Sequence, residues 1–429
     1  MKPNFQLVLI IVFVAFAVFG VLVFSGLISL GNEKNAPGGL GTVVLWGTVP
    51  NTIMSKLVED FNLANPAYIV KYMEKSPKTF DRDLLEALAE GEGPDMFLLP
   101  DNLAYHYSKK IFPIPYTSVP LASFKNVFAG PAEVFLTAGG IMAFPLYVDP
   151  LMMYYNRSTL DANAVVYPPA TWDELIDLVP ALTKKDPTNK ILKSTVGMGQ
   201  FSNVANAKEL LATLFMQKNN PIIAQKGESL SATLDDVSYD LAPTLKFYTD
   251  FADPLHPAYS WNKSFPGSRD AFSAENVAFY FGFASELQSL VNKNPNQNFL
   301  AAPVPQVKGS NFKRTFAHVT GVAISSSSKN LTTAFTAASA MSSSDFAGKL
   351  ATALNVAPAR RDLLSIKPAD EYSPAFYDSA IYGRSFLDPA PTESGVIFRG
   401  MVENVLSNSM TADAALKDAD SKLNFLLLN

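Results

Sequence analysis

The chain has 429 residues, a formal net charge of −5 at pH 7 and no cysteine. The missing cysteines exclude disulfides, thiolate metal sites and a cysteine nucleophile. With 34 basic and 39 acidic residues, the chain lacks the basic surface that a nucleic-acid partner needs. Beyond the first 41 residues the chain is longer than one hydrophobic core normally supports, so we expect two lobes.

Residues 5–28 form a long apolar run without a single charged residue. At about 1.5 Å per residue, a helix of this length spans a hydrocarbon core roughly 30 Å thick. Lys2 precedes the run, and Glu33 and Lys34 are the next charges after it. This pattern favours a single-pass plasma-membrane protein with a cytoplasmic N-terminus and an extracytoplasmic globular part. We predict a transmembrane anchor over 1–31; a cleaved secretory signal is the alternative.

The segments after the apolar run alternate between strand and helix patterns. Residues 32–41 are small, polar and rich in glycine, which predicts a flexible linker. An apolar β-rich run at 42–46 predicts a strand, and the following helix is expected to be capped by Asn51 or Thr52. Three further elements are expected: a strand at 68–73, a helix from 79 and a strand at 96–99. This alternation is typical of α/β folds with a largely parallel sheet.

The remaining chain continues as a mixture of strands and helices. Thr171 and Glu174 have the spacing of a helix capping box, and Pro180 is expected to kink or end that helix. Strands are expected near 141–145, 151–155, 196–198, 279–281, 299–304 and 321–325, and helices at 331–341, 345–354 and 412–428.

Several motifs in a fixed order resemble one known family. They are GPDMFLLPD at 93–101, FPLYVDPLMMYYNRSTLD at 144–161, PPATWDELIDL at 168–178, FSAENVAFYFG at 272–282 and VTGVAISSSSKN at 319–330. In this order they are similar to the extracellular solute-binding protein family 1. That family includes the maltodextrin- and other sugar-binding subunits of ABC importers.

The resemblance implies an α/β, two-lobed periplasmic-binding-protein-like fold of type II. Lobe 1 would comprise 42–145 plus 302–355, and lobe 2 would comprise 148–300 plus 357–429. The implied function is capture of a small solute, expected to be a saccharide, in the cleft between the lobes and its delivery to the permease subunits of an ABC transporter. The expected protein is a monomer without cofactor or metal.

Candidate ligand-binding residues follow from the rule that open α/β sheets bind ligands beyond the carboxyl ends of their strands. An aromatic side chain there can stack on a sugar ring, and a carboxylate can accept hydrogen bonds from paired hydroxyls. The resemblance also points to the segment expected to join the lobes, which contains Tyr147 and Asp149. Trp261 is a further candidate, because it lies in a polar loop where no core role is evident for it. The candidates are Trp46, Thr48, Asp101, Tyr147, Asp149, Phe201, Ser202, Trp261, Phe283 and Ser285.

Two departures from the family pattern weaken the case for a long maltodextrin. Residues 393–397 read ESGVI, and Ser285 follows the 279–281 strand, where sugar-binding relatives often carry an aromatic residue. A short oligosaccharide or a non-sugar ligand, such as a metal or a peptide, fits as well. A membrane-tethered surface-binding protein that no longer serves transport is a further alternative.

An enzyme is not expected. The three histidines, at 106, 256 and 318, have no metal-ligand spacing, and no nucleophile elbow or phosphate-binding loop is present. Tyr154 and Tyr155 could suggest an iron site, but adjacent residues of a strand face opposite sides.

Overall fold

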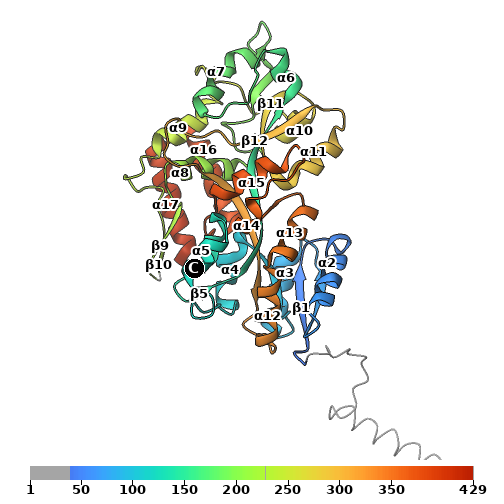
Figure 1. The fold of residues 1–429 in the computed structure, drawn as a ribbon. Helices are drawn as coiled ribbons and strands as arrows, with labels where there is room; N and C mark the ends of the chain where they lie inside the picture. The colour runs from blue at the N-terminus through green and yellow to red at the C-terminus, as the bar shows by residue number, and fades with distance from the viewer. Residues whose placement is uncertain (1–38, 228, 429) are drawn as a thin grey trace, which may run out of the picture.

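The computed structural model describes residues 39–227 and 229–428, and the predicted membrane anchor at 1–31 lies outside them. Within this described part, no helix combines the length and the apolar character that crossing a bilayer requires. Figure 1 shows two lobes, one above the other. Leu40 is already joined to the folded body, because its N–H donates to the carbonyl of Ala67 at 3.2 Å and its carbonyl accepts from Thr333.

The elements of the first part of the chain are β1 (Thr42–Gly47), α2 (Asn51–Ala64), β2 (Ile69–Glu74), α3 (Phe80–Glu90), β3 (Met96–Pro100), η1 (Asp101–Leu103), α4 (Ala104–Tyr107), η2 (Ser108–Lys110), α5 (Leu121–Val127), η3 (Gly130–Phe135), β4 (Leu136–Thr137), β5 (Gly140–Ile141) and β6 (Phe144–Asn156). The middle of the chain forms α6 (Arg157–Ala162), α7 (Trp172–Leu182), β7 (Lys184–Lys185), β8 (Ile191–Val196), α8 (Ala207–Gln217), β9 (Ile223–Lys226), β10 (Ser229–Ala232), α9 (Ala242–Asp250), α10 (Ser268–Ser273), β11 (Val277–Phe283), η4 (Ala284–Glu286), α11 (Leu287–Lys293) and β12 (Phe299–Pro303). The last part forms β13 (Thr315–Ile324), α12 (Leu331–Met341), α13 (Ser344–Ala353), β14 (Ala357–Pro358), α14 (Arg361–Leu364), α15 (Ser373–Tyr382), β15 (Gly383–Arg384), α16 (Pro391–Leu406) and α17 (Ala412–Leu428).

One mixed sheet runs through both lobes in the order β2-β1-β3-β13-β6-β11-β8-β7. β1 pairs in parallel with β2 and with β3, as the strand–helix alternation predicts. β13, which comes late in the chain, lies between β3 and β6 and is antiparallel to both. The lobe at the bottom of Figure 1 therefore contains segments from distant parts of the sequence.

β6 and β13 are the strands that connect the lobes. The prediction of two separate strands, at 141–145 and 151–155, is wrong, because β6 is continuous from Phe144 to Asn156. Its two prolines lie where the pairing changes: Pro145 faces a register shift in β13, and Pro150 is the last residue paired with β13 before Leu151 pairs with β11. Proline has no backbone N–H to donate to a strand ladder, so it is tolerated where the ladder is interrupted or changes partner.

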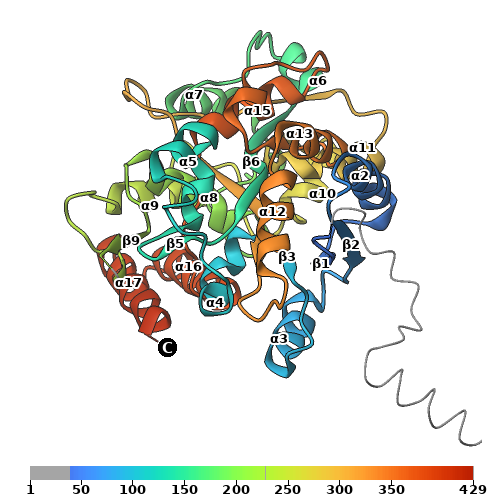
Figure 2. The same ribbon diagram turned by 60° about the horizontal axis from the view of Figure 1, so that its bottom comes forward.

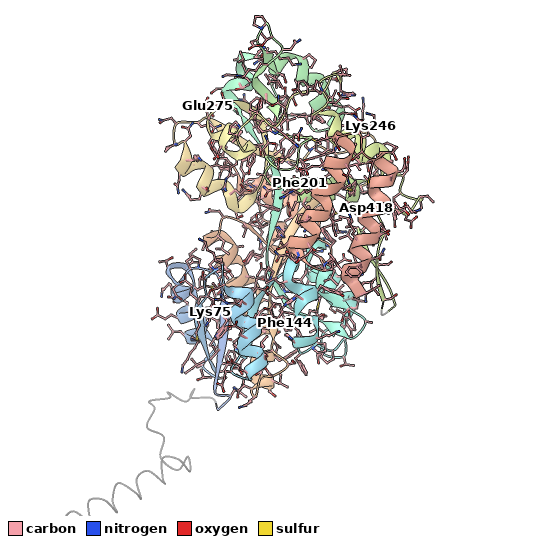
Figure 3. The ribbon with its side chains drawn as sticks, turned by 180° about the vertical axis from the view of Figure 1, so that it is seen from behind. Lys75, Phe144, Phe201, Lys246, Glu275 and Asp418 are labelled. Carbon is pink, nitrogen blue, oxygen red and sulfur yellow. The ribbon has the colours of Figure 1, made fainter. Side chains whose placement is uncertain are left out.

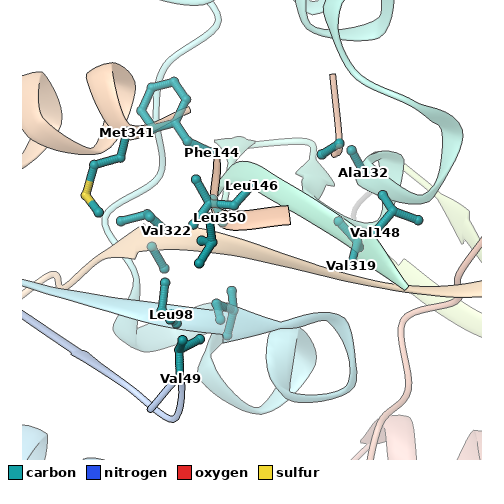
Figure 4. Packing of buried hydrophobic residues seen from close by; sticks show 14 of the residues in the cluster. Val49, Leu98, Ala132, Phe144, Leu146, Val148, Val319, Val322, Met341 and Leu350 are labelled. Carbon is teal, nitrogen blue, oxygen red and sulfur yellow. The ribbon is translucent and has the colours of Figure 1, made fainter. Parts of the chain in front are cut away.

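Two large apolar clusters fill the two sides of the molecule. The first includes residues of β1, β3, α12 and α13, and the second includes residues of α7, α8, α9, α16 and α17. Figure 4 shows a part of the first cluster, in which Val148 of β6 and Val319 of β13 lie side by side. Figure 3 shows Lys75 and Phe144 in one lobe and Glu275 and Lys246 in the other.

Two helix starts test the predicted capping residues. The capping box of α7 is confirmed: Thr171 Oγ1 accepts from the N–H of Glu174 at 3.3 Å, and Glu174 Oε2 accepts from the N–H of Thr171. The predicted cap of α2 is wrong, because the N-cap is Pro50 and the N–H of Asn51 donates instead to Glu74 Oε2 at 2.7 Å. A carboxylate from β2 thus satisfies a helix-end donor that no local side chain reaches.

Candidate functional site

The connecting strands place four polar side chains on one face of the sheet between the lobes. Asp149 of β6 is in register with His318 of β13, and Tyr147 is in register with Thr320. Since side chains alternate along a strand, these two pairs point to the same side. Tyr147, Asp149 and His318 are only partly buried, whereas the neighbouring Val148 and Val319 are fully buried.

An ion pair between the partly buried His318 and the buried Asp101 joins this face to the end of β3. His318 Nδ1 lies 2.9 Å from Asp101 Oδ1 and 3.2 Å from Oδ2, and Asp101 also accepts from the Ser385 hydroxyl. Burial alone lowers the pKa of His318, but the charge and hydrogen bond of Asp101 outweigh it and raise that pKa to about 9. His318 is therefore an imidazolium at neutral pH, and both of its ring nitrogens carry a proton.

Aromatic rings surround the imidazolium. The ring centroid of Phe283 lies 4.7 Å from that of His318, and the ring of Phe316 lies 4.9 Å away in an edge-on arrangement. Phe386 packs on Phe316 at 6.1 Å. These rings cover part of the His318 ring and lower the local polarity, which strengthens its electrostatic interaction with Asp101.

The second carboxylate of the site, Asp149, is bonded to the upper lobe. Its Oδ1 accepts from the backbone N–H of Ser285 at 2.9 Å. Burial raises the pKa of the Asp149 carboxyl to about 6, although hydrogen bonds from Ser285 and the charge of His318 act in the opposite direction. Asp149 therefore changes its charge close to neutral pH.

Opposite these groups, Lys208 of α8 forms a buried ion pair with Asp388, which lies between β15 and α16. Their side chains are 12% and 5% exposed. Ser394 completes the network: its Oγ lies 2.7 Å from Lys208 Nζ and 3.0 Å from Asp388 Oδ2. The segment in which the family pattern often has a stacking aromatic thus contributes a hydroxyl that holds an ion pair.

A pocket of about 150 Å³ lies between the Asp101 end of β3 and α8. It is lined by Asp101, Asn102, Lys208, Glu209, Phe316, His318, Phe386, Asp388 and Pro391. Two acceptors in its wall have no hydrogen-bond partner within the described part of the chain. One is Asn102 Oδ1, which is fully buried, and the other is the carboxylate of Glu209, which is partly exposed and whose charge helps to raise the pKa of His318. A buried acceptor without a partner is costly, so this wall is suited to a ligand that donates hydrogen bonds.

The structure brings five of the predicted site residues together around His318. Asp101 and Phe283 contact His318, and Ser285 bonds to Asp149. Tyr147 is in register with Thr320, the next residue of β13 on the same face as His318. Phe283 lies within β11 and not after it, because the strand extends two residues beyond the predicted end.

Four other predicted residues lie apart from this cluster. The ring of Trp46 is covered by Lys75, whose Nζ lies 3.4 Å from the ring centroid, and Thr48 is partly buried just after β1. The ring of Phe201 lies 5.7 Å from the Arg399 guanidinium of α16, and Ser202 is exposed. Figure 3 shows Phe201 in the lobe that also holds Lys246.

The reason given for Trp261 as a ligand residue is wrong. Its side chain is fully buried, stacks on Phe265 at 4.4 Å and donates from Nε1 to Asn203 Oδ1 at 3.1 Å. It is the centre of a small core of its own, with Val204, Ala271 and Val277. The residues next to Trp261 in the sequence are mostly polar, and most of the side chains that bury it come from other parts of the chain. The sequence around Trp261 therefore gives no sign of this core.

Sequence reasoning missed His318, Lys208, Glu209 and Asp388. The sequence does contain a signal for His318. It shares a strand face with Phe316 and Thr320, and it is the one ionisable residue in a largely apolar run. The other three carry no local pattern: Lys208 and Asp388 are 180 residues apart and meet only in the folded chain.

Sequence and structure comparisons agree on the class of protein. The family model of the bacterial extracellular solute-binding proteins matches residues 56–375, and the chain belongs to this family. No curated protein matches the chain significantly.

Solved structures with the same two-lobed fold are numerous. The sugar-binding protein MalE from Xanthomonas citri aligns with a TM-score of 0.73 and 19% identity, over 90% of this chain and 97% of its own. A cyclo/maltodextrin-binding protein in complex with maltotetraose aligns with a TM-score of 0.72 and 18% identity, over 92% and 98%. The GacH receptor of Streptomyces glaucescens, solved unliganded and with acarbose, aligns with a TM-score of 0.66 and 18% identity, over 91% and 99%. These likenesses establish the two-lobed solute-binding fold.

Proposed function

We propose that the protein captures a short saccharide between its lobes and delivers it to the membrane subunits of an ABC-type importer. The observation that carries this proposal is the buried acceptor Asn102 Oδ1, which has no hydrogen-bond partner in the described part of the chain and shares a pocket wall with the Glu209 carboxylate. Sugar hydroxyls donate to such acceptors, while the rings of Phe316 and Phe386 in the same pocket offer apolar faces. The relatives solved with maltotetraose and acarbose support the saccharide class.

The size of the pocket favours a short ligand. At about 150 Å³ it is smaller than the usual 300–1,000 Å³ of ligand sites, and it has no exposed stacking ring in the 393–397 segment. The iron alternative is less favoured, because Tyr154 and Tyr155 belong to different apolar clusters on opposite faces of β6.

We propose the following organisation around this site. Lobe 1 comprises 42–145 plus 302–355, lobe 2 comprises 148–300 plus 357–429, and the lobes hinge within β6, where the chain passes from lobe 1 to lobe 2. The apolar run at 5–28 anchors a monomeric extracytoplasmic protein to the membrane, with its N-terminus in the cytoplasm. The missing lipid-modifiable cysteine supports a peptide anchor.

Thermal unfolding of the full chain against a panel of mono-, di- and maltooligosaccharides tests the proposal. A ligand at 100 times its Kd stabilises the folded state by about 2.7 kcal/mol, which is a clear rise in Tm. In Glu209→Gln we expect about tenfold weaker binding of that saccharide, because a charged acceptor is lost. Glu86→Gln, an exposed change on α3, is the matched control and should bind as the parent does.

The outcomes separate the alternatives. If no saccharide raises Tm while Fe³⁺ or a peptide mixture does, the ligand is not a sugar. If a saccharide binds equally well to Glu209→Gln and to Glu86→Gln, the pocket is not the binding site.

A further inference from the structure

A second cavity, separate from the saccharide pocket, contains two arginines. Its volume is about 280 Å³, and it lies between η3 on one side and the end of α8 with β9 and β10 on the other. Arg314 enters its wall from the residue just before β13, and Arg384 enters from β15. β13 and β15 pair in parallel, with Phe316 beside Arg384, so the two arginines come from adjacent strands.

The donors of both guanidinium groups are almost entirely unused. Arg384 Nη1 donates to the carbonyl of Gly383 at 2.7 Å, and Arg314 Nη1 donates to the carbonyl of Lys313 at 2.9 Å. A guanidinium has five N–H donors. Over residues 39–227 and 229–428, no carboxylate oxygen lies within 4.0 Å of either group.

The surroundings are electropositive in a protein whose net charge is negative. Burial, and then the charge of Arg314, lower the pKa of Arg384, and Arg361 acts in the same direction. Glu133 is the one acidic residue in the cavity wall, and its carboxylate lies 3.5 Å from Lys125 Nζ. The charge of Glu133 acts to raise the pKa of both arginines, so two positive charges share one carboxylate that is also paired with Lys125.

Space for the Arg384 guanidinium depends on a glycine. A Cβ at position 130 would lie 1.5 Å from Arg384 Nη1 and 2.7 Å from the carbonyl oxygen of Gly383. Any other residue at Gly130 would therefore displace the guanidinium from the wall. The opposite wall combines the apolar side chains of Met216, Ile223 and Leu230 with the amides Asn219, Asn220 and Gln225.

We propose that this cavity is a binding site for a small oxyanion, a phosphate or carboxylate group with at most a small apolar substituent. The two guanidinium groups present planar pairs of donors that match the oxygens of such a group. The bound anion neutralises two adjacent positive charges, and Met216 and Ile223 accommodate its apolar part.

The site is distinct from the saccharide pocket but adjacent to it. Ser385 lines the oxyanion cavity and bonds to Asp101, while Phe386 lines both cavities. The proposal does not depend on saccharide binding, because it rests on Arg314, Arg384 and Gly130 alone.

Isothermal titration of the full chain with inorganic phosphate and with acetate, each at constant ionic strength against chloride, tests the proposal. Constant ionic strength removes general screening effects. We expect saturable binding of one anion per chain, and about tenfold or greater weakening in Arg314→Gln and in Arg384→Gln. The control is Arg82→Gln, an exposed arginine paired with Asp83, which should bind as the parent does.

Whichever of phosphate or acetate binds more tightly identifies the preferred group, and either result supports the site. Arg384→Lys, which keeps the charge and loses the planar fork, should bind with intermediate affinity and serves if Arg384→Gln does not fold. Anion binding that is no tighter than that of chloride, or that is equally strong in Arg314→Gln and Arg82→Gln, would overturn the proposal.

Discussion

His318 occupies the point where the connecting strands, the end of β3 and the upper lobe meet. Its positive charge is held by Asp101, and its ring is enclosed by Phe283 and Phe316. A pKa raised from 6.5 to about 9 means that the folded state binds a proton more tightly than the unfolded state does. The stabilisation is fully present below pH 6.5 and is lost as the pH rises through 9.

The first prediction concerns this pH dependence. A rise of this size in the pKa corresponds to about 3 kcal/mol, and the 32% exposure of the side chain reduces that to about 1–2 kcal/mol. The free energy of unfolding of the parent, measured with urea at pH 6 and pH 9.5, should fall by that amount. In His318→Gln the fall should disappear, whereas the exposed His106→Gln should retain it. If the free energy of unfolding of His318→Gln fell between pH 6 and pH 9.5 as much as that of the parent, the assigned ion pair would be contradicted.

Asp149 gives a second prediction, which rests on the proposed saccharide function and on the ligand extending from the pocket residue His318 to its strand neighbour Asp149. The ionised carboxylate of Asp149 only accepts hydrogen bonds, whereas the protonated form also donates one. A pKa of about 6 places the loss of this proton between pH 5 and pH 7. Saccharide affinity measured by calorimetry should rise by up to about tenfold over this range. Asp149→Asn should remove the pH dependence, and the exposed Asp270→Asn should keep it. A pH-independent parent would exclude Asp149 from ligand binding.

How far the site could be read from the sequence differs between residues. Asp101 and Asp149 were predictable, because one follows an apolar strand and the other lies in a segment with a strong family resemblance. Lys208, Asp388 and Asn102 were not, because their roles arise from contacts between segments that are far apart in the sequence. The ligand role expected of Trp261 fails because the residues that bury it come from a loop, two helices and a strand in other parts of the chain.

At the scale of elements, local chemistry accounts for the successes. The capping box of α7 is encoded within four residues, so it needs no tertiary contact to be recognised. The buried strands β1 and β3 are short apolar runs bounded by turn residues. Pro145 and Pro150 disfavour a central strand, which agrees with the prediction of two short strands where the structure has the single strand β6. The prolines are accepted because the pairing of β6 changes at these two positions.

The capping box supplies the third prediction. Thr171→Ala removes the acceptor for the Glu174 N–H and should lower the free energy of unfolding by about 1 kcal/mol. Thr171→Ser keeps the hydroxyl and should retain most of the stability. The midpoints of urea unfolding at constant m value provide the comparison. Equal loss in both variants would mean that the methyl group, and not the cap, stabilises the start of α7.

For the whole molecule, the contacts between lobes away from the site determine how easily the lobes separate. The apolar side of α17 packs in the second cluster, yet its last turn reaches α4 at the end of the first lobe. Tyr105 Oη donates there to the carbonyl of Leu427 at 2.8 Å. Figure 2 shows α4 and α17 on the same side of the molecule. This hydrogen bond favours the arrangement of lobes in the structure over one in which they are further apart.

The fourth prediction is that Tyr105→Phe shifts this equilibrium. A neutral hydrogen bond contributes about 1 kcal/mol, so its loss should change the ratio of the two arrangements by about fivefold. Small-angle X-ray scattering of the unliganded protein should give a larger radius of gyration, and saccharide affinity should fall by a similar factor. Tyr116→Phe is the matched control, because its hydroxyl also donates to a backbone carbonyl, that of Thr137 at 2.7 Å, but within one lobe. If both variants change the radius of gyration equally, or if neither does, the Tyr105–Leu427 contact does not restrain the lobes, and the restraint lies in the connecting strands β6 and β13.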